Sequence, residues 1–156
     1  HLRFDRRALG WGIGAGLLGI VLWLAVERIP YPHLGSRTGF DPFAAIADPT
    51  LRACFVVGRF FGLALLVPVV EEVFWRGFAL RYATDQDRWE EIRTGDFSPL
   101  AAAIVAGLFA LAHPEWLAAA LYALGMSLLL RRTRSLAACV VAHAATNLSL
   151  GIWVVT

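Results

Sequence analysis

Ionisable and amide side chains stand inside apolar stretches of this 156-residue chain, and their types suit hydrolytic chemistry. A carboxylate with histidines can hold and deprotonate a water molecule, and a carboxamide can donate a hydrogen bond to the oxyanion that forms on a substrate carbonyl. This set of side chains is therefore the candidate site. Its members are Glu71, Glu72, Arg76, His113, His143 and Asn147.

The spacing of these residues along the chain predicts different roles for them. Adjacent residues on a helix point about 100° apart, so Glu71 and Glu72 cannot face the same direction. Glu72 and Arg76 are four residues apart, with the acid N-terminal to the base, which is the favourable order for an intrahelical ion pair. Glu71 has no such partner on its helix. His143 and Asn147 are also four residues apart and share one helix face.

The composition indicates a membrane protein. The chain is 58% hydrophobic and 17% charged, whereas an average soluble domain is about 45–50% apolar and about 25% charged. A charged side chain at the centre of a membrane helix costs roughly 2.5–3.5 kcal/mol, so it persists where it is paired or functional. The net charge is only +2 and no basic cluster alternates with aromatic residues, so no nucleic-acid partner is expected.

The apolar stretches predict about five transmembrane helices, because about 20 helical residues cross the hydrocarbon core. We expect one all-α, polytopic membrane domain over residues 1–156, with its helices in a conical or bundle arrangement around the polar site. The first span would cover 8–26 and an external loop 27–50. The remaining region, 51–155, holds the candidate residues. Its predicted spans are 51–82, 99–113, 115–130 and 136–155.

Local signals support these bounds. Ser98 followed by Pro99 is a favourable helix start, and Pro114 would stop the third span. Pro68 is expected to kink the second span one turn before the glutamates.

Small residues predict packing. The first span carries glycines at small-xxx-small spacing, which favours close approach of another helix. They are Gly10, Gly12, Gly14, Gly16 and Gly19. Cys54 and Cys139 have no metal-type spacing, so we expect them to be buried small hydrophobic residues.

Basic residues indicate the orientation. They gather at Arg3, Arg6 and Arg7, between residues 81 and 93, and at 131–134, which all fall on one side if there are five spans. Since short Arg-rich loops stay in the cytoplasm, a cytoplasmic N-terminus is expected.

The depth of the candidate residues can be estimated from the helical rise. Glu71 and His143 both come out roughly 12–15 Å from the cytoplasmic boundary at about 1.5 Å per residue, so they could meet. The same estimate places His113 deeper in the membrane than Glu71 and His143. Its helix must therefore tilt, start lower in the membrane or form a re-entrant segment.

Three motifs in order resemble those of a known family. EEVFWR at 71–76 matches EExxxR, FALAH at 109–113 matches FxxxH, and HAATN at 143–147 matches HxxxN. The chain resembles the CPBP intramembrane proteases, the CAAX-protease and bacteriocin-processing family, over a protease core at 51–155. The sequence around these motifs looks most like that of the bacterial CAAX protease-related branch associated with exosortase systems.

The resemblance implies an intramembrane endopeptidase that uses a glutamate-activated water. Carried over by position, Glu71 would be the general base and Asn147 would stabilise the oxyanion. His113 and His143 would position the water.

The resemblance also implies supporting residues and leaves the cofactor open. Glu72 with Arg76 would brace the motif helix, and Phe109 would pack beside His113. A divalent metal such as zinc is compatible with one carboxylate and two histidines, and a metal-free glutamate and water mechanism is equally compatible. The metal ligands would be Glu71, His113 and His143.

The implied substrate is a peptide bond in a membrane-associated or lipidated protein or peptide tail, such as a sorting-signal tail. The implied location is the lipid bilayer of a bacterial inner membrane. The alternative function is a catalytically silent membrane scaffold or adaptor of the same fold. A proton-coupled transporter is weaker, because the chain has neither an internal repeat nor paired broken helices.

Overall fold

The computed structural model describes residues 4–36 and 39–155, and every regular element in these two ranges is helical. Arg3 of the N-terminal basic cluster lies outside the described residues. The predicted all-α fold class is confirmed. The elements in chain order are α1 (Arg6–Val26), α2 (Pro42–Ala45), α3 (Pro49–Phe61), the π-helix η1 (Gly62–Leu66), α4 (Val67–Glu72), the π-helix η2 (Val73–Ala79), α5 (Leu80–Thr84), α6 (Pro99–Leu111), α7 (Trp116–Thr133) and α8 (Leu136–Val155).

α1 begins at a side-chain cap. The carboxylate of Asp5 accepts a hydrogen bond from the backbone N–H of Ala8 at 2.7 Å, which satisfies one of the free donors at the helix start. The helix has 21 residues, so it is about 31 Å long at 1.5 Å per residue, enough to cross the hydrocarbon core. The predicted first span therefore corresponds to a helix of sufficient length, which starts two residues earlier than expected.

The glycines of α1 fall on two different faces. A Cβ at Gly16 would lie 2.6 Å from the carbonyl oxygen of Ala142 in α8, and one at Gly12 would also collide with α8. The predicted close helix approach is thus confirmed for this face. At Gly10 and Gly14 a Cβ would meet nothing within 4 Å, so those glycines do not serve this packing.

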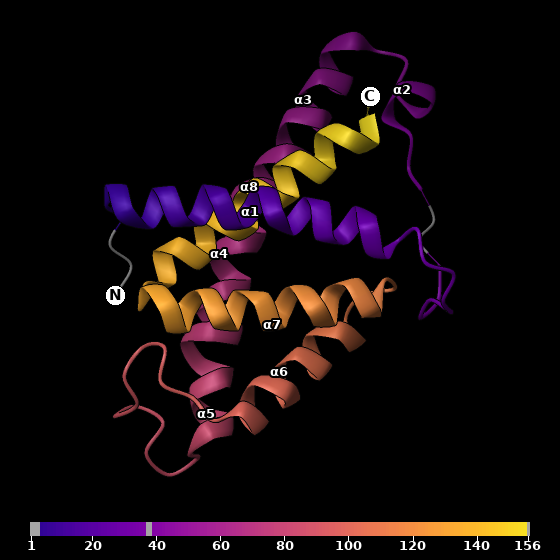
Figure 1. Cartoon of the computed structure of the whole chain (residues 1–156). Helices are drawn as coiled ribbons and strands as arrows, with labels where there is room; N and C mark the ends of the chain where they lie inside the picture. Colours follow the sequence, from indigo (N-terminus) through magenta and orange to yellow (C-terminus); the bar gives the residue numbers. More distant parts are fainter. Residues whose placement is uncertain (1–3, 37–38, 156) are drawn as a thin grey trace.

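One long helical rod runs from Pro49 to Thr84 and carries the glutamates near its middle. It passes through α3, η1, α4, η2 and α5 in succession and crosses behind α1 and α7 (Figure 1). A π-helical turn lies just before Pro68, where the N–H of Val67 donates to the oxygen of Gly62. Wider turns thus flank the short α4. The kink at Pro68 stays a prediction.

α6 and α7 form a tight helical hairpin. Ser98 caps α6 by accepting a hydrogen bond from the N–H of Ala101 at 3.0 Å, and Pro99 is the first helical residue, as predicted. α6 ends at Leu111, so His113 lies just beyond the helix. α7 continues to Thr133, three residues past its predicted end.

The loops show which helix ends lie together. The backbone N–H of Leu34 donates to the oxygen of Pro114 at 2.9 Å, so the loop after α1 contacts the turn between α6 and α7. At the other end, Arg131 donates to the oxygen of Phe97 at 2.6 Å, and Arg134 pairs with Asp96. α6 therefore connects the loop beside the end of α7 to the turn beside the loop after α1.

Three helices of the described chain are long and apolar enough to cross a membrane by length and composition. They are α1, the rod Pro49–Thr84 and the helix Leu136–Val154. α6 is apolar but has only 13 residues, which gives about 20 Å and falls short of the roughly 30 Å core. The protein is a polytopic helical membrane protein, while the total of five spans stays a prediction that depends on α6 and α7.

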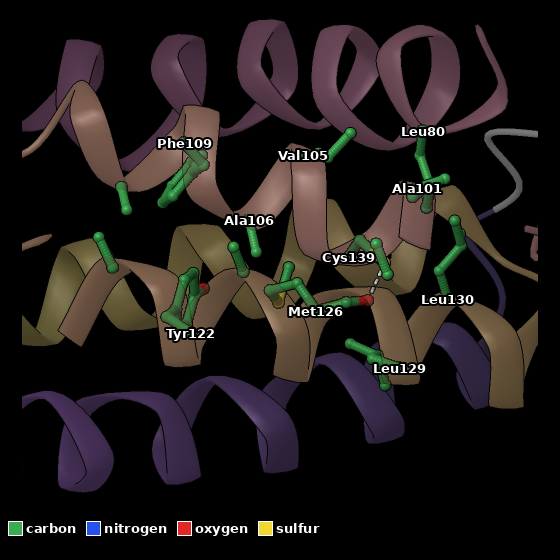
Figure 2. Close-up of a cluster of buried hydrophobic side chains, with 14 of the residues drawn as sticks. Leu80, Ala101, Val105, Ala106, Phe109, Tyr122, Met126, Leu129, Leu130 and Cys139 are labelled. Carbon is green, nitrogen blue, oxygen red and sulfur yellow. Dashed lines mark hydrogen bonds between the residues drawn. The ribbon is translucent and has the colours of Figure 1, made fainter. Parts of the chain in front are cut away.

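The buried core lies mainly between α6 and α7, with Cys139 of α8 beside it (Figure 2). Many of its residues are alanines, which let these helices approach closely. Cys139 is buried as expected, and its thiol lies 3.7 Å from the oxygen of Met126. Cys54 is exposed on α3, so the prediction that it is buried in the protein is wrong. Its helix has no buried residue because it packs little against the rest of the chain.

Candidate active site

The two glutamates sit at the end of α4 and face different surroundings. The side chain of Glu72 is completely buried, whereas that of Glu71 is 29% exposed. This is the divergence that the 100° step between helical neighbours predicts. Glu72 therefore belongs to the interior of the protein, and Glu71 borders accessible space.

The carboxylate of Glu72 joins two helices through one oxygen. Its Oε1 accepts a hydrogen bond from Nη1 of Arg76 at 3.1 Å, so the predicted intrahelical pair is present. The same Oε1 lies 2.8 Å from Nδ1 of His143 in α8. All three side chains are almost fully buried, and such a charge cluster is tolerated only when its members are paired.

Arg76 connects this cluster to the α6–α7 hairpin. Its Nη2 donates to the backbone oxygen of Ala123 in α7 at 3.3 Å. Its guanidinium lies over the ring of Phe109 in α6, 5.1 Å from the centroid. One buried cation thus holds the glutamate helix against both partner helices.

The tautomer of His143 follows from its partner. An ionised carboxylate only accepts hydrogen bonds, so Nδ1 of His143 carries the proton that it donates to Glu72. The other nitrogen, Nε2, lies 3.9 Å from Oε2 of Glu71. That distance is too long for a direct hydrogen bond. Oε2 of Glu71 is buried and has no hydrogen-bond partner among the described residues.

His113 lies beside this group without joining it. Its Nδ1 donates to the backbone oxygen of Phe109 at 2.8 Å, since a carbonyl can only accept. Its ring stacks on that of Phe109 with centroids 4.5 Å apart, so the expected packing of Phe109 beside His113 is present. The ring of Phe109 also contacts that of His143 edge-on, at 6.5 Å. The two imidazoles therefore lie on one aromatic side chain.

Asn147 is turned toward the long rod. Its Nδ2 donates to the backbone oxygen of Leu63 at 2.9 Å. In the π-helical register of η1, that oxygen would accept from the N–H of residue 68. Residue 68 is proline and has no N–H, so the Asn147 amide replaces the missing donor.

The predicted metal ligands do not assemble into a metal site. Among the described residues, no group of three or more His, Cys, Asp or Glu side chains could hold a metal ion. Glu71 approaches Nε2 of His143, while His113 is held at Phe109. The arrangement does not fit the metal, and no catalytic step is derived through one.

The match to a protein-family model decides the relationship of this chain. Residues 53–149, 97 of the 156 residues, match the model of the type II CAAX prenyl endopeptidase Rce1-like family. The chain belongs to the Rce1-like family. This membership confirms the resemblance to CAAX proteases and points to a peptidase with a peptide substrate. No curated protein and no solved structure matches the chain.

The Rce1-like match covers the whole candidate site. All three motifs lie within residues 53–149, whereas α1 lies before the matched region. α1 nevertheless contributes to the site, because the edge of Trp23 contacts the ring of His113 with centroids 6.2 Å apart.

Two further residues of this Rce1-like chain support His143 and were not predicted. The ring of Tyr122 meets that of His143 edge-on at 5.7 Å, and its hydroxyl donates to Oγ1 of Thr146 at 3.3 Å. Oγ1 of Thr146 donates to the backbone oxygen of Gly16 at 2.9 Å. Thr146 lies three residues after His143, so helical spacing could have placed it beside that face. Nothing in the sequence points to Tyr122.

Proposed function

We propose that this protein is an intramembrane endopeptidase that hydrolyses a peptide bond of a membrane-associated or lipidated protein or peptide tail. The observation that carries the proposal is the arrangement of Glu71 opposite Nε2 of His143, with Nδ1 of that histidine held by buried Glu72. Membership of a family described as CAAX prenyl endopeptidases supports the reaction class.

The reaction begins with one water molecule between Glu71 and His143. Two hydrogen bonds of about 2.8 Å can meet at a water that bridges groups too far apart for direct contact. Oε2 of Glu71 and the unprotonated Nε2 of His143 both accept from the water, which leaves an oxygen lone pair for attack. Glu71 takes one proton as the water attacks the carbonyl carbon, and returns it to the leaving amine.

The other candidate residues act around this water. Asn147 has a second N–H besides the one donated to Leu63, and this N–H stabilises the oxyanion of the tetrahedral intermediate. His113 has Nε2 available to position the water or the substrate, because Nδ1 is bound to Phe109.

We further propose a bacterial inner-membrane location with a cytoplasmic N-terminus, in the branch associated with exosortase systems. The basic residues support this orientation. Arg6, Arg7 and Arg132 border one groove, and Arg131 and Arg134 contact the loop before α6 at the same end. Such an end is expected to face the cytoplasm.

The proposal is tested by replacing Glu71 with Gln in protein reconstituted into liposomes with a lipidated peptide. Loss of the base should lower the cleavage rate by about 10²–10⁴-fold while the protein still inserts and keeps its helicity. Glu91→Gln, at an exposed loop residue, is the matched control and should cleave at the wild-type rate. A wild-type rate for Glu71→Gln would reject Glu71 as the base and favour the scaffold alternative.

A further inference from the structure

We propose that the groove between α1 and α7 binds an anionic phospholipid, with the phosphate at its arginine-rich mouth and an acyl chain along its floor. The groove has a volume of about 750 Å³ and is lined only by residues of these two helices. Figure 1 shows the two helices side by side, with the start of α1 above the end of α7. This inference does not depend on the proposed peptidase activity.

The charge of the groove calls for an anion. Arg6, Arg7 and Arg132 line it and are exposed, and none of them forms an ion pair with a described residue. Arg6 and Arg7 also occupy the first turn of α1, where the helix dipole disfavours cations. Three guanidiniums in this position repel one another, and a phosphate that accepts hydrogen bonds from them would relieve the repulsion.

The length of the groove fits one leaflet of a bilayer. Its α1 wall runs from Arg6 to Leu18, which is about 18 Å at 1.5 Å per residue. Half of a hydrocarbon core is about 15 Å. A headgroup bound at the arginines would therefore leave its acyl chain lying along Trp11 and Leu18.

Glycines on both helices help to keep the groove open. A Cβ at Gly10, Gly14 or Gly125 would meet nothing within 4 Å. Glycine inside a helix is less favourable than alanine, and packing within the protein does not account for these three. An acyl chain would fill the space that they leave.

The combination of features selects the class of lipid. A zwitterionic lipid brings its own cation to the mouth and neutralises the arginines poorly. A soluble anion would leave the apolar floor uncovered. An anionic glycerophospholipid would pair its phosphate with the arginines and cover the apolar lining with an acyl chain. Each arginine is expected to improve the affinity for this lipid about fivefold.

The test uses quenching of tryptophan fluorescence by brominated acyl chains in phosphatidylcholine nanodiscs. A minor fraction of brominated phosphatidylglycerol should quench Trp11 at least fivefold more strongly than the same fraction of brominated phosphatidylcholine. The Trp11 contribution is the part of the signal that disappears in Trp11→Phe. Equal quenching by the two lipids would overturn the proposal.

Two kinds of variant test the two ends of the groove separately. Combined Arg6→Gln, Arg7→Gln and Arg132→Gln should abolish the preference for phosphatidylglycerol. A control with Arg28→Gln, Arg88→Gln and Arg93→Gln removes three exposed charges outside the groove and should retain it. Gly14→Leu should exclude the acyl chain while every arginine remains. Retention of the preference in both the groove triple variant and Gly14→Leu, with helicity unchanged, would contradict the site.

Discussion

At the scale of single residues, the buried carboxylate of Glu72 organises the site. It binds Arg76 on its own helix and His143 on α8 through the same oxygen. The first contact follows from i, i+4 spacing and was predictable. The second joins residues 71 positions apart in the chain, and no local pattern indicates it.

Removing Arg76 should destabilise the protein strongly. Arg76→Met would leave Glu72 as a buried acid without its cation and should cost about 3–5 kcal/mol of unfolding free energy. Arg76→Lys keeps a positive charge but lacks the planar guanidinium that reaches both Glu72 and Ala123. It should therefore lower the free energy of unfolding by less than Arg76→Met does. Reversible unfolding in mixed micelles measures the change in unfolding free energy for both variants. If Arg76→Met is as stable as the wild type, the cluster does not hold the helices together.

At the scale of elements, the two π-helices flank α4 within the long rod, where α4 packs against α8. Helix bounds followed from composition and caps, as at Ser98 and Pro99. The π-helical turns could not be predicted, because i→i+5 bonding has no pattern of residue types. At η1 the turn depends on the amide of Asn147, which lies 84 residues from its acceptor in the chain.

The Asn147 amide and Pro68 should be energetically coupled. Asn147→Ala removes the donor to Leu63 and should cost about 1 kcal/mol. In a Pro68→Ala background the backbone can supply its own N–H, so the same substitution should cost close to nothing. A double-mutant cycle of unfolding free energies measures the difference. Equal costs in both backgrounds would mean that Asn147 does not replace the missing donor.

At the scale of the whole molecule, loop contacts place the helix ends that composition alone left uncertain. The loop after α1 contacts Pro114 and Trp116, and the loop before α6 contacts Arg131 and Arg134. The depth of His113 predicts that the third helix tilts, starts lower or re-enters, and this stays a prediction. The third span is predicted as a short one, 99–113, and α6 ends two residues earlier, at Leu111.

The proposed orientation predicts which loops can be labelled from outside the cell. Ser36→Cys lies in the loop after α1, and Asp87→Cys lies in the polar loop after α5. In a background with both native cysteines changed to alanine, a membrane-impermeant maleimide should label Ser36→Cys in intact cells. Asp87→Cys should react only after lysis. Labelling in the opposite pattern would invert the topology.

The central claim is that Glu71 and Nε2 of His143 act on one water molecule. The most direct measurement is the cleavage rate of Glu71→Gln, His143→Asn and the double variant in liposomes. Asn at position 143 can still donate to Glu72 while it removes Nε2, so the buried cluster is kept. Because residues that act as a unit are not additive, the double variant should be no slower than the slower single variant. Rate losses that multiply would show that the two residues act independently and would contradict the account.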